Sequence, residues 1–179
     1  MRPQPRVLLL PGLYDSGPEH WQTHWEHADP TFHRVVQRDW ETPARDEWVA
    51  TLERVVELSG PDVVLVGHST SCALVAFWAG QSARTVRGAL LVAPSDTEAP
   101  AYPVGPTGWQ PMPMNRFSFP SIVVMSDDDE YVSVARATAF AAAWGSTLVN
   151  IGTAGHVNSA SGLDGWPAGR SLVEGLMRR

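Results

Sequence analysis

Short apolar runs rich in branched residues recur along the chain, and each one ends in residues typical of turns. Most of the segments between them place apolar residues at intervals of three and four, which is the spacing of an amphipathic helix. Strands that alternate with helices are typical of a parallel sheet with both faces covered. We therefore predict an α/β protein, with strands at residues 7–10, 32–37, 63–67, 89–93, 122–125 and 148–151 and helices at residues 19–28, 45–58, 70–83, 132–144 and 168–177.

Prolines mark two further features of the chain. Pro18 and Pro167 lie where the first and last helices are expected to begin, a position that their fixed φ favours. Residues 94–120 instead carry seven prolines, which exclude a long helix or a central strand, so we predict a long loop over the sheet. Such a loop is a lid or a binding surface, or it only covers an edge of the sheet, and the sequence leaves both interpretations open.

The strand predicted at residues 63–67 runs directly into Gly67, His68 and Ser69, and an apolar helix follows at once. This arrangement matches a nucleophile elbow, G-x-S-x-G, in which a sharp strand-to-helix turn exposes a serine hydroxyl at the top of a sheet. Ser71 stands where the motif has its second glycine, and it is a small residue. The helix N-terminus behind Ser69 favours negative charge. We predict that Ser69 is a nucleophile.

Composition and charge exclude several other functions. A length of 179 residues is typical of one domain, which we expect to span residues 1–179. The net charge of −6, with no block of Lys and Arg, argues against a nucleic-acid partner. Cys72 is the only cysteine, which excludes an internal disulfide and a multi-cysteine zinc site. No apolar run approaches the length of about 18 to 20 residues that spans a bilayer. Residues 1–10 lack the features of a signal peptide, so we expect no membrane association and a cytoplasmic location.

A nucleophilic serine needs a histidine base, an acid that orients the histidine, and hydrogen-bond donors for the oxyanion. In a parallel sheet these groups meet at the carboxyl ends of strands. Of the six histidines, only His156 follows a strand downstream of both partners, and His68 is expected to point away from the site. An acid between Ser69 and His156 gives the chain order of α/β hydrolases. The candidate acids are Asp127, Asp128 and Asp129, which follow the fifth strand, and Asp96, which follows the fourth.

Backbone N–H groups of Leu13 and Thr70 are the expected oxyanion donors. Leu13 follows a tight turn after the first strand, and Thr70 begins the helix behind Ser69. An ordinary glycine-rich turn is the alternative for the Leu13 loop. The residues expected to line an apolar acyl pocket are Tyr14, Trp109, Met112 and Met114.

His20 and His24 are four residues apart on a predicted helix, a spacing that can place two ligands on one metal ion. No third ligand has a matching position, and Trp21 and Trp25 repeat at the same interval. We therefore predict a helix with an aromatic inner face and histidines near its rim, and no bound metal.

The chain carries several further motifs, spaced over nearly its whole length. They are Pro11-Gly12-Leu13, Ser16-Gly17-Pro18-Glu19-His20-Trp21 with Trp25, Gly67-His68-Ser69, Ser126-Asp127-Asp128-Asp129-Glu130-Tyr131-Val132, and Gly155-His156-Val157-Asn158-Ser159-Ala160-Ser161-Gly162 with Trp166-Pro167. In these motifs and their spacing, the chain resembles the retinoblastoma-binding-protein-nine-like (YdeN-type) small serine hydrolases of the α/β-hydrolase superfamily.

This resemblance implies a compact three-layer sandwich with a roughly six-stranded parallel sheet in the order 2-1-3-4-5-6, no separate cap domain, a catalytic triad and no cofactor. It also implies Asp129 as the acid, because the family's Ser-x-Asn-Asp-Pro-like stretch matches residues 126–130. Ser71 and Glu130 depart from the family's elbow glycine and its proline. The segment around Cys72 lacks an L-x-C-x-E pattern, so the resemblance implies no retinoblastoma partner here.

The predicted function is a serine hydrolase that cleaves small carboxylic ester or amide substrates through Ser69, His156, Asp129 and an acyl-enzyme intermediate. Two alternatives remain. One is a non-catalytic binding module that docks a protein on residues 94–120, and the other is an acyltransferase that uses the same site. The sequence identifies no particular protein partner.

Overall fold

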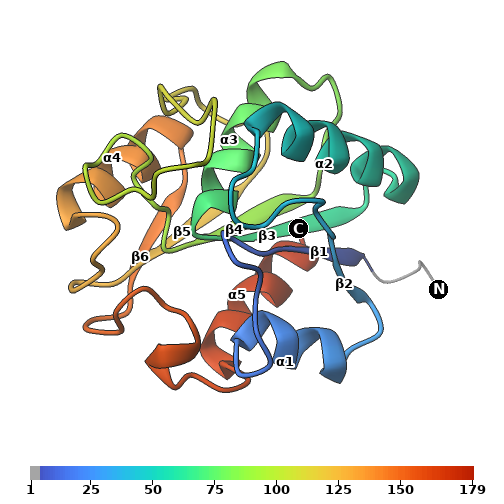
Figure 1. The fold of residues 1–179 in the computed structure, drawn as a ribbon. Helices are drawn as coiled ribbons and strands as arrows, with labels where there is room; N and C mark the ends of the chain where they lie inside the picture. The colour runs from blue at the N-terminus through green and yellow to red at the C-terminus, as the bar shows by residue number, and fades with distance from the viewer. Residues whose placement is uncertain (1–4) are drawn as a thin grey trace.

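The structure, a computed structural model, describes residues 5–179, and within them it has six strands, five α-helices and one 3-10 turn (Figure 1). Residues 1–4, part of the segment expected to lack a signal peptide, lie outside the described residues. The strands are β1 (Arg6–Leu10), β2 (Phe32–Arg34), β3 (Val63–His68), β4 (Gly88–Val92), β5 (Ser121–Met125) and β6 (Thr147–Asn150). The helices are α1 (Trp21–Ala28), α2 (Arg45–Ser59), α3 (Thr70–Gln81), α4 (Val134–Trp144) and α5 (Pro167–Met177), and the 3-10 turn is η1 (Ser159–Ser161).

All six strands are parallel and lie in the order β2-β1-β3-β4-β5-β6. Helices α2, α3 and α4 cover one face of the sheet, and α1 and α5 cover the other (Figure 1). The predicted α/β class, the three layers and the strand order are therefore confirmed. Helix α1 follows β1 on one face of the sheet and helix α3 follows β3 on the other, so the strand order changes direction between these two neighbours (Figure 1). Open α/β sheets bind ligands at such a point.

Two apolar cores lie on the two faces of the sheet, because successive strand residues point to opposite sides. In β3, Val64 and Val66 belong to the core under α1 and α5, whereas Val63 and Leu65 belong to the core under α2, α3 and α4. All four side chains are fully buried. Burial of each of these side chains contributes about 1.5–3 kcal/mol to the free energy of folding. The central strands therefore hold the carboxyl edge of the sheet rigidly in place.

Every helix and strand boundary lies within two residues of its predicted position except the end of β2. Strand β2 ends at Arg34 and not at residue 37, because its neighbour β1 ends at Leu10 and the bond from Val35 N to the carbonyl of Leu9, at 2.8 Å, is the last one between these two segments in the described residues. Helix α1 begins at Trp21, beyond Pro18, because His20 caps it with Nδ1, which accepts from the N–H of Gln22 at 3.2 Å. The prediction that Pro167 begins the last helix is confirmed.

Residues 94–120 form the predicted long loop and contain no helix or strand. Trp109 and Met112 are buried in the core under α2 and α3, and Trp109 Nε1 donates to the carbonyl of Pro43 at 3.1 Å. Tyr102 and Pro103, from the same loop, border a cavity at the carboxyl end of β3. Buried apolar side chains thus anchor the loop to the helical layer. Within residues 5–179, no helix combines the length and apolar character needed to cross a bilayer.

Candidate active site

Ser69 occupies a strained turn between β3 and α3. Its backbone has φ 60° and ψ −125°, a region that L-residues rarely adopt. The hydrogen bond from Ser69 N to the carbonyl of Val92, at 3.0 Å, holds the backbone in this strained conformation. Gly67 is needed because a Cβ at that position would lie 3.0 Å from the carbonyl oxygen of Ser71. The turn therefore presents the Ser69 hydroxyl at the carboxyl edge of the sheet.

The loop after β1 lies directly against this turn. A Cβ on Gly12 would lie 2.7 Å from the Cβ of Ser69, so only glycine allows the approach. Ser71, at the position of the usual elbow glycine, is buried, and its Oγ donates to the carbonyl of Pro11 at 2.6 Å. The departure from glycine thus supplies a direct link between α3 and the end of β1.

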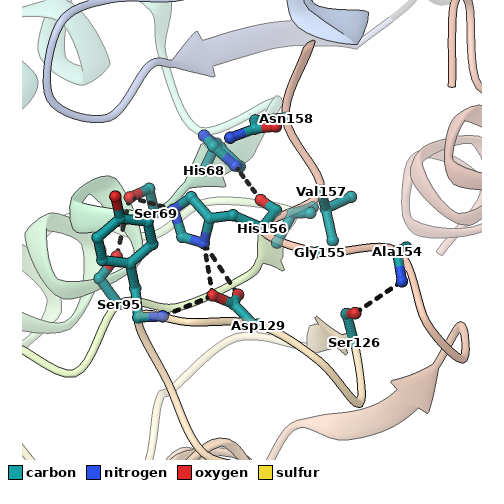
Figure 2. Close-up of polar contacts among 12 residues, drawn as sticks. His68, Ser69, Ser95, Ser126, Asp129, Ala154, Gly155, His156, Val157 and Asn158 are labelled. Carbon is teal, nitrogen blue, oxygen red and sulfur yellow. Dashed lines mark hydrogen bonds and ion pairs between the residues drawn. The ribbon is translucent and has the colours of Figure 1, made fainter. Parts of the chain in front are cut away.

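Ser69, His156 and Asp129 form a continuous hydrogen-bonded row (Figure 2). His156 Nε2 lies 2.8 Å from Ser69 Oγ, and His156 Nδ1 lies 2.9 Å from each carboxylate oxygen of Asp129. The Asp129 side chain is fully buried and also accepts from the N–H of Tyr131 at 2.9 Å. A carboxylate only accepts, so Nδ1 carries the proton and Nε2 accepts from the serine hydroxyl.

The other candidate acids have different partners. Asp96 accepts from Arg136 at 2.7 and 2.9 Å in a bidentate pair, and this hydrogen bonding raises the pKa of Arg136. Asp127 accepts from the Nδ2 of Asn150 at 2.7 Å. Neither aspartate contacts the histidine, so the structure brings Asp129 alone of the four candidates to the imidazole.

Asp128 holds the loop that carries His156. Its Oδ1 accepts from Ser126 Oγ at 2.7 Å and from the N–H of Gly155 at 2.8 Å. These hydrogen bonds, with that of Ser126 first, hold the pKa of Asp128 below its ordinary value. Ser126 Oγ in turn accepts from the N–H of Ala154 at 2.9 Å (Figure 2). The turn after β5 therefore fixes both the aspartate and the backbone beside the histidine.

The structure contradicts two predictions for histidines. His68 does not point away from the site, because its Nε2 donates to the carbonyl of His156 at 2.9 Å and the two ring centroids are 5.0 Å apart (Figure 2). His20 is not at the rim of α1, because it is buried with its ring centroid 4.7 Å from that of His68. The first contact joins the end of β3 to the loop after β6, and the second joins the end of β3 to the β1–α1 loop.

Burial keeps these two histidines neutral. Desolvation, with a smaller contribution from Arg34, lowers the pKa of His20 from 6.5 to about 4. Desolvation also lowers the pKa of His68 well below 6.5. At neutral pH neither ring places a positive charge beside His156. Within the described residues, no group of three His, Cys, Asp or Glu side chains is arranged to hold a metal ion.

A cavity of about 390 Å³ opens beside Ser69. All three tyrosines of the chain line it, and no Lys or Arg appears among the described residues in its wall. Burial raises the pKa of one of them, Tyr102, to about 12. The wall is formed by Leu13, Tyr14, Asp15, Gly17, His20, His68, Ser69, Thr70, Ser95, Tyr102, Pro103, Tyr131, His156, Asn158, Ser159 and Ala160.

The predicted pocket residues are only partly at this cavity. Tyr14 lies in its wall, but Trp109, Met112 and Met114 do not. Trp109 and Met112 are buried in the core, and Met114 is 42% exposed elsewhere. The sequence did not single out Tyr102, which lies in the same proline-rich loop as Trp109, Met112 and Met114 and is likewise a large side chain with an apolar body. The loop turns this side chain toward the cavity and the others away from it.

The two predicted oxyanion donors also border the cavity. Leu13 and Thr70 are both in its wall, and within residues 5–179 neither backbone N–H donates to a protein acceptor. The next N–H in the loop, that of Tyr14, donates to the carbonyl of Trp40 at 2.7 Å. Thr70 is the first residue of α3, where helix N–H groups lack intrahelical partners.

The fold and this arrangement of side chains define a class of protein. A parallel sheet in this order, with a serine on a strained turn after β3, an aspartate after β5 and a histidine after β6, is the architecture of an α/β hydrolase. The chain belongs to the Serine hydrolase family, whose sequence profile matches residues 7–175. The family and its structural neighbours identify the protein as a hydrolase.

Solved structures of similar fold support this assignment. A protein described as a YdeN-like hydrolase, from Pectobacterium atrosepticum, is 32% identical, with 98% of this chain and 91% of that chain covered and a TM-score of 0.85. The ydeN gene product of B. subtilis is 15% identical, with 98% and 100% covered and a TM-score of 0.80. Est1E from Butyrivibrio proteoclasticus is 12% identical, with 99% and 91% covered and a TM-score of 0.71, and so shares the fold. No curated protein matches the chain by sequence.

Proposed function

We propose that this protein hydrolyses small carboxylic esters or amides through a covalent acyl-enzyme, with Ser69 as the nucleophile. The observation that carries the proposal is the unbroken row of hydrogen bonds from Ser69 Oγ to His156 Nε2 and from His156 Nδ1 to Asp129, at 2.8 to 2.9 Å. This row places a base within reach of the serine proton and a buried carboxylate behind the base.

In the acylation step, Ser69 Oγ attacks the substrate carbonyl carbon while its proton moves to His156 Nε2. Asp129 holds the histidine in the tautomer that can accept this proton and stabilises the imidazolium that forms. The N–H groups of Leu13 and Thr70 donate to the oxyanion of the tetrahedral intermediate. The bond to the leaving group then breaks, and His156 gives its proton to the departing oxygen or nitrogen.

In the deacylation step, water replaces the leaving group. His156 takes a proton from the water as it attacks the acyl carbon, and the carboxylic acid leaves as the proton returns to Ser69. The cavity supplies room for this exchange, because its volume of about 390 Å³ is within the range of small-molecule sites. Its tyrosine-rich wall, without Lys or Arg among the described residues, favours small substrates that carry no negative charge. We propose that Tyr14 contacts the substrate at the mouth, where it is 65% exposed.

Labelling with a fluorophosphonate tests the nucleophile. We expect the wild-type protein to be labelled once per chain and Ser69→Ala to remain unlabelled, with its melting temperature close to the wild-type value. The wild-type protein should also hydrolyse a panel of short-chain p-nitrophenyl esters and aminoacyl amides. Equal labelling of Ser69→Ala would reject this nucleophile. A wild-type protein that neither reacts nor turns over any substrate would favour a binding module instead.

A further inference from the structure

A second buried serine contacts the proposed nucleophile. Ser95 follows β4 and is only 3% exposed, and its Oγ lies 2.8 Å from Ser69 Oγ (Figure 2). It lies in the wall of the same cavity. Ser69 Oγ thus has two side-chain partners, His156 Nε2 on one side and Ser95 Oγ on the other.

The protons in this cluster can be assigned by counting. His156 Nδ1 faces both oxygens of Asp129 and must donate, which leaves Nε2 as an acceptor. The single proton of the Ser69 hydroxyl is therefore used in its bond to Nε2. Since that proton is used, the hydrogen bond between the two serines runs from Ser95 to Ser69. Ser95 donates to a lone pair of the attacking oxygen.

We propose that Ser95 is a positioning residue that accelerates the acylation step by this donated hydrogen bond. The inference rests on the proposed function, in which Ser69 is the nucleophile. A serine side chain has three staggered χ1 positions, and two hydrogen bonds together hold Ser69 in one of them. The bond to Ser95 and the bond to His156 occupy two directions around Oγ, so the free lone pair is held in one direction for attack.

The same hydrogen bond strengthens as the reaction begins. While the proton moves from Ser69 to His156, negative charge grows on Oγ, and hydrogen bonds to charged oxygens are stronger than those to neutral ones. The Oγ–carbon bond forms, the bond to the leaving group breaks, and the Ser69 proton passes through Nε2 to the leaving group. Ser95 keeps its own proton throughout. It stabilises charge and transfers nothing.

This role applies to the attack of Ser69 on the substrate, whereas deacylation begins with the attack of water on the acyl carbon. In the acyl-enzyme, Ser69 Oγ is an ester oxygen, whose lone pair is delocalised into the carbonyl and accepts hydrogen bonds weakly. Water is then the attacking group, and we expect its attack to limit the recovery of the free enzyme. Ser95 acts again only after that attack, when the bond between the acyl carbon and Oγ breaks. A residue that merely supports the fold would affect both steps alike.

A p-nitrophenyl carbamate separates the two steps, because carbamoylation and recovery of the free enzyme are timed independently. We expect Ser95→Ala to reduce the limiting rate of carbamoylation about tenfold, which corresponds to about 1.4 kcal/mol. The carbamate concentration that gives half of this rate, and the rate of recovery, should stay within about twofold of wild type. The fluorophosphonate labelling rate should fall by the same factor, and Ser95→Thr, which retains the hydroxyl, should restore most of it.

Ser121→Ala is a matched control. Ser121 and Ser146 form another Ser–Ser hydrogen bond, at 2.6 Å, at the opposite end of the sheet, and Ser121 is also buried. This variant should be carbamoylated at the wild-type rate. A wild-type carbamoylation rate in Ser95→Ala would overturn the inference, and so would equal slowing of both steps with a lowered melting temperature. Ser69→Ala distinguishes the two proposals: if it is labelled, the proposed function itself fails.

Discussion

Replacement of Asp129 by asparagine tests the acid of the proposed mechanism most directly. The carboxylate is fully buried and lies 2.9 Å from His156 Nδ1 through both oxygens. Asparagine has nearly the same shape but no charge, so the packing around it is retained. An amide can also donate its N–H to Nδ1, which moves the histidine proton to Nε2. In that tautomer His156 cannot accept from Ser69.

The size of the effect follows from the geometry. With about 4 Å between the centres of charge and an effective dielectric constant of about 20, the attraction between Asp129 and the imidazolium is about 4 kcal/mol. This attraction exists only once the histidine is protonated, so its loss raises the barrier by a similar amount, which corresponds to about a thousandfold in rate. The tautomer change adds to the loss. We therefore expect kcat/KM to fall about 10³- to 10⁴-fold.

The assay is ester hydrolysis measured with wild type, Asp129→Asn and the matched variant Asp127→Asn. Asp127 belongs to the same acidic turn but is exposed and accepts from Asn150, so its neutralisation should change kcat/KM less than about twofold. Thermal melting verifies that all three proteins are folded. The reasoning is refuted if Asp129→Asn keeps more than a tenth of the wild-type kcat/KM while it remains folded.

Two further predictions concern the loop after β1 and the buried histidine of α1. Gly12→Ala should lower kcat/KM at least a hundredfold, because its Cβ would lie 2.7 Å from that of Ser69 and must displace the elbow, and steady-state kinetics near the wild-type value would contradict this steric argument. The second prediction concerns the pH dependence of stability. The pKa of His20 is lowered from 6.5 to about 4 in the folded protein, so between these pH values the unfolded state binds more protons than the folded state. The free energy of unfolding should therefore fall by up to about 3 kcal/mol as the pH falls through this range. Asparagine in His20→Asn keeps an N-cap acceptor but does not titrate, so urea denaturation should show a smaller loss of stability on acidification than in wild type. If stability depends on pH as steeply in this variant as in wild type, the assignment to His20 is wrong.

The order of strands and helices was predictable from the sequence alone. Apolar positions repeat every two residues in a strand and every 3.6 in a helix, and this period is a local property of the chain. The Ser69 turn was predictable for the same reason, because Gly67, His68 and Ser69 are contiguous between an apolar strand and an apolar helix. The boundaries of β2 and α1 shifted, because a neighbouring strand and a side-chain cap decide where each element ends.

Only the tertiary structure decided which side chains meet. Asp127, Asp128 and Asp129 are adjacent and chemically identical, and the family pattern, not the residues themselves, favoured the one that reaches His156. Apolar residues of a proline-rich loop can face the core or a cavity, and the path of that loop over α2 and α3 buried Trp109 and turned Tyr102 toward the site.

The contacts of His68 with His156 and of Ser95 with Ser69 had no sequence signal, because each joins segments that lie far apart along the chain. What the sequence by itself determined is the set of elements and the serine turn, since both depend on neighbouring residues. What only the tertiary structure decided is the surroundings of that serine, since strands β1, β3, β4, β5 and β6 each end beside it and their order in the sheet sets which loops touch.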